Sequence, residues 1–274
     1  KKLNNLGIPV YFVIGNHDLY HRNSRDVHSV IPFSEFDNFI IIEEPLVVDT
    51  IKDSILFCPY LFHDEYPMLK KYNDIPIWAG HFEFRGFVVT GYNVTMPTGP
   101  EAKDYHGPKY IFSGHFHKRQ AGENIIYIGN TFPMDFGDAG DFERGCMVYD
   151  HNNNEIMFKD WDACPKYIKT TLSSLLDNNT VLYDNARVKV DVDVNISFEE
   201  SMLVQQNFVD NYNPREFIME ESPELALSLT ETTTTIDVTN ELASVNDLVM
   251  QMLNEIENDK IDNDMLVGVY QQLK

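Results

Sequence analysis

The chain has 274 residues, 43% of them hydrophobic, which suits one large globular domain with a smaller one beside it. It has no apolar run near the roughly 20 residues of a membrane span and no visible signal peptide, so we expect a cytoplasmic protein that makes no membrane contact. The net charge is −22, from 21 basic and 43 acidic residues, which excludes the broadly basic surface of many nucleic-acid-binding proteins.

The first predicted element is an apolar strand that ends in polar residues. The run Val10-Tyr-Phe-Val-Ile14 stops at Gly15, and its continuous apolar character predicts a strand buried on both faces. Asn16, His17 and Asp18 follow the glycine directly. A glycine at this point lets the backbone turn sharply and approach a ligand closely.

Two further predicted strands end in the same way. The run Ile75-Pro-Ile-Trp-Ala-Gly80 is followed by His81, and the run Ile111-Phe-Ser-Gly114 is followed by His115 and His117. Residues two apart on an extended chain point to the same side, so these last two imidazoles should be aimed alike. Ligands of open α/β sheets gather at the carboxyl ends of the strands, so we expect the polar residues after all three strands to converge.

The residue types at these strand ends suit divalent metal ions. Imidazole, amide oxygen and carboxylate are ligands of manganese, iron or zinc, and no cysteine takes part. Two ions about 3.5–4 Å apart can clamp a phosphate and activate water, which requires several groups of ligands. A single histidine of this kind could simply end a strand in a satisfied hydrogen bond, but three clusters in one chain favour a metal centre.

Composition and periodicity divide the rest of the chain. Residues 1–160 alternate strand-like runs with loops. Residues 161–212 should hold a connector, an alternating strand at 187–194 and a helix that opens with a capping box at Ser197. Residues 213–240 are rich in Glu, Ser and Thr, which predicts a flexible acidic linker.

The C-terminal segment, residues 241–274, carries a helical apolar stripe. A polar break at 259–264 separates it from a second short amphipathic helix. These apolar faces need cover from the parent domain or from a partner, and the preceding linker favours a partner. Acidity also concentrates here, since residues 191–274 have 3 basic and 18 acidic residues against 18 and 25 in residues 1–190. The stripe consists of Val245, Leu248, Val249, Met252, Leu253 and Ile256.

The motifs Gly-Asn-His-Asp, Gly-His and Gly-His-x-His, in this order, resemble those of the calcineurin-like metallophosphoesterases. The similarity continues through residues 124–133, Phe136-Gly-Asp-Ala-Gly140 and Glu143-Arg-Gly145, where the chain looks like the nuclease subunit of the SbcC–SbcD type of bacteria and phages. It covers residues 1–200 well and the tail more loosely. The resemblance implies an α/β fold: a metallophosphoesterase sandwich of two mixed sheets flanked by helices, then a small capping domain (161–212) and C-terminal helices.

Carried over motif by motif, the resemblance assigns the metal ligands. Asn16, His81 and His115 would bind one divalent ion, and His117 would bind a second. Manganese is the metal that the family implies first, with magnesium or iron(II) as alternatives.

The resemblance also implies a proton donor and two DNA contacts. His17 would protonate the leaving oxygen, oriented by Asp18, because a histidine beside a carboxylate titrates near neutrality. Asp18 could instead be an ordinary turn residue. Lys118 and Arg119 follow the last motif directly, and they would either contact a DNA phosphate or form a solvated turn.

The function implied is that of a metal-dependent DNA nuclease subunit, with exonuclease and endonuclease activity in DNA repair and recombination. Its partners would be DNA and an SMC-like ATPase of the SbcC type, held by residues 241–274, in a complex that contains a dimer. Because the chain is acidic, most of the DNA affinity would come from the partner. Two alternatives stay open, a small-molecule metallophosphodiesterase with the same motifs and a non-catalytic interaction subunit with the same fold.

We expect the chain to lack the family's first two motifs, Asp-x-His and Gly-Asp-x-x-Asp on two opening strands. We therefore expect residues 1–160 to be a nuclease domain without its first strands. The second metal ion would keep only His117 as a ligand, so the chain alone should be a weak or inactive nuclease.

Overall fold

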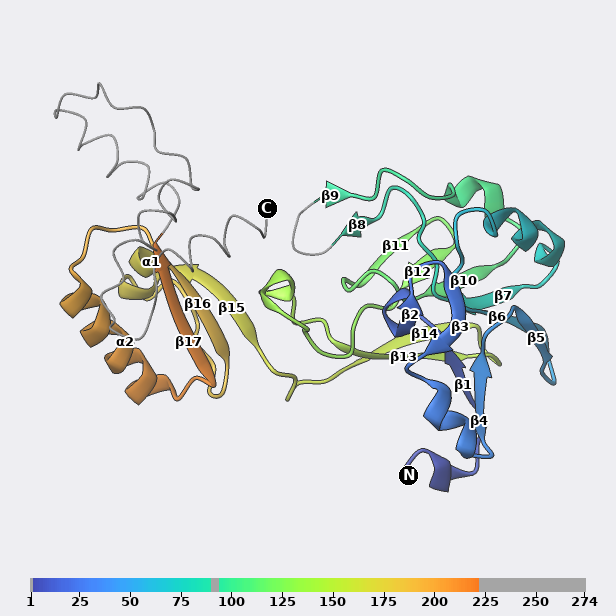
Figure 1. The fold of residues 1–274 in the computed structure, drawn as a ribbon, viewed down its shortest axis with the longest axis horizontal. Coiled ribbons are helices and arrows are strands. Elements are labelled where there is room, and N and C mark those ends of the chain that lie inside the picture. The colour runs from blue at the N-terminus through green and yellow to red at the C-terminus, as the bar shows by residue number, and fades with distance from the viewer. Residues whose placement is uncertain (1, 90–93, 222–274) are drawn as a thin grey trace, which may run out of the picture. The chain divides into compact units, whose positions relative to one another are not determined.

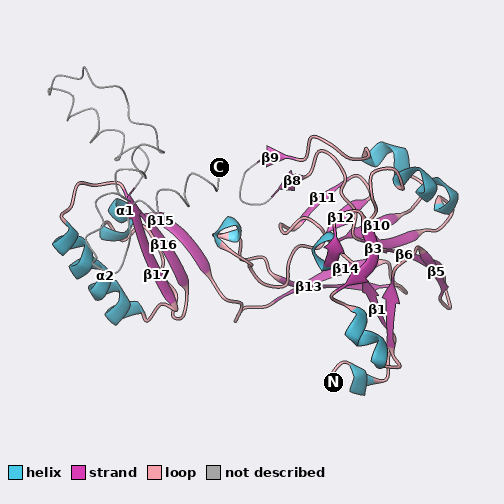
Figure 2. Ribbon diagram, in the orientation of Figure 1, coloured by secondary structure: helices cyan, strands magenta, loops and turns pink. Residues whose placement is uncertain are grey.

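The computed structural model, drawn in Figure 1, describes residues 2–89 and 94–221. The predicted mixed α/β class is confirmed, with many short strands and few helices (Figure 2). Within this described part of the chain, no helix is long and apolar enough to cross a bilayer. The predicted linker from residue 222 onward and the segment 241–274 lie outside the described residues.

A six-stranded sheet forms the centre of the fold, in the order β11-β12-β10-β7-β6-β5. Strands β6, β7, β10 and β12 run parallel, and the two edge strands run antiparallel to their neighbours. The carboxyl ends of the parallel strands therefore share one edge of the sheet, where ligands of such sheets bind. The strands are β5 (Leu46–Asp49), β6 (Ser54–Cys58), β7 (Ile77–Gly80), β10 (Tyr110–Ser113), β11 (Gln120–Gly122) and β12 (Ile125–Tyr127).

The other elements before residue 161 are short. The two-stranded pairs are β1 (Val10–Val13) with β4 (Phe39–Ile42), β2 (Leu19–His21) with β3 (Ser24–His28), β8 (Val88–Val89) with β9 (Val94–Thr95), and β13 (Gly145–Asp150) with β14 (Glu155–Asp160). The 3₁₀ helices are η1 (Asn4–Leu6), η2 (Asn16–Asp18), η3 (Ile31–Glu35), η4 (Tyr66–Tyr72), η5 (Ala102–Tyr105) and η6 (Phe136–Asp138).

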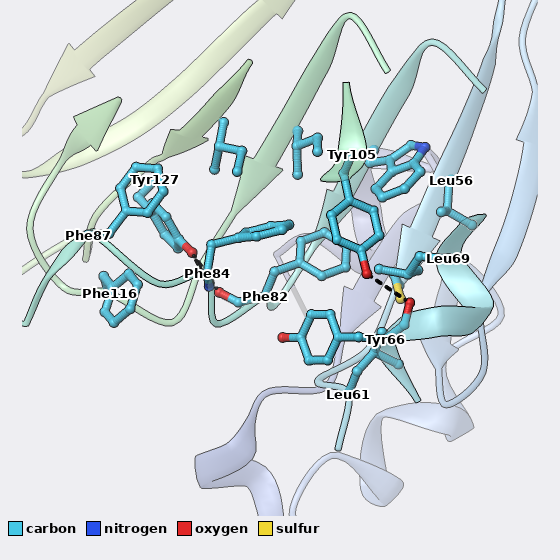
Figure 3. Packing of buried hydrophobic residues seen from close by; sticks show 14 residues of the cluster. Leu56, Leu61, Tyr66, Leu69, Phe82, Phe84, Phe87, Tyr105, Phe116 and Tyr127 are labelled. Carbon is cyan, nitrogen blue, oxygen red and sulfur yellow. Dashed lines mark hydrogen bonds between the residues drawn. The ribbon is translucent and has the colours of Figure 1, made fainter. Parts of the chain in front are cut away.

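The core fixes the loop that follows β7. Trp78 in β7 and Ile111 in β10 have no exposed surface, as their apolar runs predict. Figure 3 shows the aromatic cluster beside them. There the Tyr127 hydroxyl donates to the Phe82 carbonyl at 3.0 Å and accepts the Phe84 N–H at 3.0 Å. The segment just after Gly80-His81 is thus hydrogen-bonded to Tyr127 of the neighbouring strand β12.

Strand β1 differs from its prediction. All four of its residues are half-buried, and it pairs only with β4 in a sheet of two strands. A continuous apolar run does not reveal how many neighbours a strand will have. Its end still lies beside the central sheet, because the Tyr60 N–H donates to the Ile14 carbonyl at 2.8 Å and Tyr11 stacks on Phe57 with ring centroids 4.3 Å apart.

Residues 161–221 add a small α/β region of three parallel strands and two helices. The predicted capping box is confirmed, since the Ser197 hydroxyl accepts the Glu200 N–H and the Glu200 carboxylate accepts the Ser197 N–H. The alternating strand is confirmed as well, because β16 shows every second residue buried. The elements are β15 (Tyr167–Thr171), α1 (Leu172–Leu176), β16 (Arg187–Val192), α2 (Phe198–Tyr212) and β17 (Glu216–Glu221).

Two predicted boundaries in this region are corrected. Strand β15 and helix α1 lie inside the predicted connector, and β17 lies inside the start of the predicted linker 213–240. Strand β17 pairs with β16, and its Phe217 stacks on Phe208 of α2 with ring centroids 5.8 Å apart. Three glutamates in this short strand gave it the composition of a linker, although its apolar residues close the sheet.

Candidate metal centre

The polar residues after three strands meet at one point, as their motifs predict. The Asn16 Oδ1 atom lies 2.9 Å from His81 Nε2, and His115 Nδ1 lies 3.3 Å from the same nitrogen. These residues follow β1, β7 and β10 respectively. Three potential donor atoms therefore face one another across more than 60 positions of sequence, which is the arrangement of a coordination site.

The backbone around His81 is shaped for a close approach. A Cβ atom on Gly15 would lie 2.8 Å from His81 Cε1, and one on Gly114 would lie 3.0 Å from His81 Nδ1. His115 adopts a φ of 79°, a left-handed conformation that side chains other than glycine rarely take. Backbone strain of this kind collects at functional sites, where the surrounding structure holds it in place.

Electrostatics keep His81 uncharged. Burial, together with smaller electrostatic contributions from His115, His17 and His117, lowers the pKa of His81 to about 3. Metal ions bind the neutral imidazole, whose nitrogen lone pair is free. A neutral His81 with an amide oxygen and a second imidazole fits a divalent cation. It also shows that His17 and His117 lie close enough to act on His81.

Glu83 is a residue of this centre that sequence reasoning missed. Its Oε2 atom lies 3.3 Å from His115 Nε2, and its side chain is largely buried. The hydrogen bond with His115 lowers the pKa of Glu83, so it is a carboxylate at neutral pH. Metal-binding histidines commonly donate their second ring N–H to a carboxylate. The sequence offered one clue to Glu83. It lies two residues after His81, and side chains two residues apart on an extended segment point to the same side.

A second carboxylate, that of Asp138, lies beside the His117 ring. The His117 Nδ1 atom lies 3.6 Å from the Oδ1 atom of Asp138, whose side chain is fully buried, and this carboxylate raises the pKa of His117. Arg144, also buried, places Nη2 3.2 Å from the same Asp138 oxygen and donates from Nη1 to the His117 carbonyl at 2.9 Å. Asp138 and Arg144 therefore hold the second histidine of Gly-His-x-His from its ring and from its backbone.

His17 and Asp18 form the 3₁₀ turn η2 after Gly15. The Asp18 carboxylate accepts the Gly15 N–H at 2.8 Å and the Ser29 hydroxyl at 3.2 Å. Asp18 thus has the contacts of a turn residue, the alternative left open by the sequence, and its orientation of His17 stays a prediction.

Of the two candidate DNA contacts, Arg119 is already engaged. Its Nη2 atom lies 2.8 Å from Asp160 Oδ1, its guanidinium lies 4.0 Å above the Phe158 ring, and its side chain is only 13% exposed. A phosphate would have to displace these contacts. Lys118 instead lines an open cavity of about 970 Å³ together with Lys169.

The patterns Asp-x-His and Gly-Asp-x-x-Asp do occur later in the chain, but in other roles. Asp26-Val-His28 lies in β3, where His28 Nε2 is 3.0 Å from Glu43. Gly137-Asp-Ala-Gly-Asp141 contains the Asp138 that backs His117. Among residues 2–89 and 94–221, no three His, Cys, Asp or Glu side chains form a complete metal cage. The candidate donor set described above accordingly includes an amide, that of Asn16.

Comparison with known proteins agrees with these motifs. Residues 1–119 match the family described as calcineurin-like phosphoesterase, a range that includes every predicted metal ligand. A protein of Enterobacteria phage T4 named "Exonuclease subunit 1" is 26% identical over 160 residues, 57% of this chain and 46% of that protein. The chain thus matches about half the length of this curated relative. Glu83 lies inside the family match, whereas Asp138 and Arg144 lie beyond it.

Proposed function

We propose that residues 1–119, which match the calcineurin-like phosphoesterase family, form a metallophosphoesterase domain, and that the chain is the nuclease subunit of a DNA repair and recombination complex of the SbcC–SbcD type. The phage T4 relative, which is named as an exonuclease subunit, supports a DNA substrate and a partner subunit. The observation that carries the proposal is the convergence of Asn16 Oδ1, His81 Nε2 and His115 Nδ1. Such a donor set suits the divalent metal ions that this family uses.

In the proposed reaction, each residue has one task. Asn16, His81 and His115 would hold one divalent ion, manganese in the first instance, and His117 would be a ligand of a second. The ions, when bound, would supply Lewis-acid activation of the phosphodiester. His17 would give a proton to the leaving oxygen of the sugar as a general acid. Glu83 would keep His115 in the ring orientation that turns Nδ1 toward His81.

Metal binding and hydrolysis can be tested on one variant. We expect the full 274-residue chain to bind manganese and to hydrolyse single-stranded DNA slowly, and His81→Ala to lose both at least 10-fold, because the site loses one of three donors. Isothermal titration with manganese and release of labelled nucleotides measure the two effects. His106→Ala is the matched control, since His106 is exposed and contacts only the Lys103 carbonyl.

The outcomes separate the three functional readings. Hydrolysis of thymidine p-nitrophenyl phosphate without hydrolysis of DNA would favour the small-molecule phosphodiesterase. Manganese binding without any hydrolysis would favour the non-catalytic interaction subunit. Cleavage that persists in His81→Ala would contradict the proposed centre.

We also propose that residues 241–274 bind an SMC-like ATPase through their apolar stripe. Deleting them should abolish co-purification with that ATPase and leave the unfolding temperature of the remaining chain unchanged, because residues 1–221 form a unit with its own contacts. Leu248→Glu on the stripe should act like the deletion, whereas Gln251→Glu, off the stripe, should not. A complex that survives the deletion would rule out this docking role.

A further inference from the structure

Two aromatic rings remain exposed beside the His117 loop. Phe132 is 47% exposed and Trp161 is 44% exposed, and their ring centroids lie 6.5 Å apart at an interplanar angle of 84°. Met134, 58% exposed, follows on the same loop. Single exposed apolar side chains are ordinary, but a contacting pair of exposed aromatic rings next to a candidate functional centre is typical of a binding surface.

Hydrogen bonds fasten this pair to the candidate metal centre. The Asn130 N–H, two residues before Phe132, donates to the His117 carbonyl at 2.9 Å. The Trp161 N–H donates to the Arg144 carbonyl at 2.6 Å, and Arg144 donates from its side chain to the same His117 carbonyl. Phe132 and Trp161 therefore lie in segments that are linked by hydrogen bonds to the backbone of His117. We expect a DNA strand bound at the centre to pass close to both rings.

The charge of the chain decides what such a surface can hold. Residues 1–190 have 18 basic and 25 acidic residues, and Arg119, the first arginine after His117, is paired with Asp160. Residues 1–190 therefore have a net negative charge, which disfavours binding through phosphates alone. Aromatic faces bind unstacked nucleobases without basic residues, and each stacked base changes the affinity by about 5- to 150-fold. Bases inside a duplex are stacked already and cannot use such a surface.

We propose that Phe132 and Trp161 form a stacking platform for the unpaired bases of single-stranded DNA beside the metal centre. The proposal rests on the proposed nuclease function. The platform would let an acidic subunit hold a single strand by its bases, so its binding should depend little on salt concentration.

The chain carries its own reporter for this contact. Trp161 and Trp78 are its two tryptophans, and Trp78 has no exposed surface. Oligothymidylate added to the full chain in EDTA, where no cleavage occurs, should quench the fluorescence of Trp161. An oligonucleotide of the same length with abasic sites keeps the phosphates and lacks the bases, and it should quench little, as should a blunt duplex.

Variants extend the test to affinity. Phe132→Ala and Trp161→Ala should each weaken binding of labelled oligothymidylate at least 5-fold by fluorescence polarisation. Tyr212→Ala, which removes a ring of similar exposure on α2, should leave the affinity unchanged. Unfolding temperatures should stay close to that of the parent chain, because both rings are substantially exposed.

The result separates this inference from the proposed function. Equal quenching by the abasic strand, no quenching at all, or unchanged affinity in both variants would overturn the platform, including the case in which the rings contact a protein instead. Hydrolysis of bis(p-nitrophenyl) phosphate, which has no base, tests the phosphodiesterase alone. Base-dependent quenching without that hydrolysis would support the platform and contradict the nuclease.

Discussion

Arg144→Met should lower the free energy of unfolding by about 3–5 kcal/mol, because it leaves the buried Asp138 carboxylate without its cationic partner. Both side chains have essentially no exposed surface, and Arg144 contacts Asp138, Asp141 and the His117 carbonyl at once. The segment 138–144 and the His117 loop would lose these contacts. Denaturation by urea, followed by circular dichroism, measures the loss.

Two further variants test the cause of this loss. Adding Asp138→Asn to Arg144→Met should recover part of the stability, because the uncompensated buried charge is removed. Arg22→Met, at an exposed arginine, should change stability by no more than about 0.5 kcal/mol. A loss below about 1 kcal/mol in Arg144→Met would show that the buried cluster does not depend on this pair.

Glu83→Gln should weaken manganese binding by about 10- to 100-fold, the usual effect of removing a carboxylate behind a ligating histidine. The glutamine keeps the size of the side chain but loses the charge that faces His115 Nε2 at 3.3 Å. The His115 ring would then be free to turn its other nitrogen toward His81. Isothermal titration with manganese on the full chain gives the change in affinity.

The matched control for this variant is Glu155→Gln, at an exposed position of β14, which should bind manganese like the parent chain. Glu83→Gln should also unfold at nearly the same temperature in EDTA, since its role concerns the ligand and not the core. Equal manganese affinity in Glu83→Gln and Glu155→Gln would remove Glu83 from the centre.

The sequence predicted the candidate donor residues of this centre but not the buried residues that hold the histidines in position. Asn16, His81 and His115 each follow a glycine at the end of an apolar strand, and local pattern is enough to find such positions. Arg144 reaches the His117 carbonyl across 27 residues, and although Glu143-Arg-Gly145 carries part of the family resemblance, the local sequence assigns Arg144 no role. Its role arises from packing between loops, which periodicity does not report.

The fold was predictable to a similar depth. Strands β7 and β10 were recognised because a strand buried on both faces needs a continuous apolar run. Strand β1 has the same kind of run but is only half-buried, and β17 was hidden by its glutamates. In both cases the pairing partner, which lies far away in sequence, determines the environment of the strand.

The left-handed backbone at His115 links the stability of the chain to its chemistry. A histidine held at a φ of 79° raises the free energy of the folded state by about 1–3 kcal/mol, and a glycine at this position would relieve it. A glycine would therefore be the more stable residue here, whereas the proposed metal site requires an imidazole. Stabilising sequence designs applied to this chain should consequently keep residue 115 fixed, since there the most stable residue and the functional one differ.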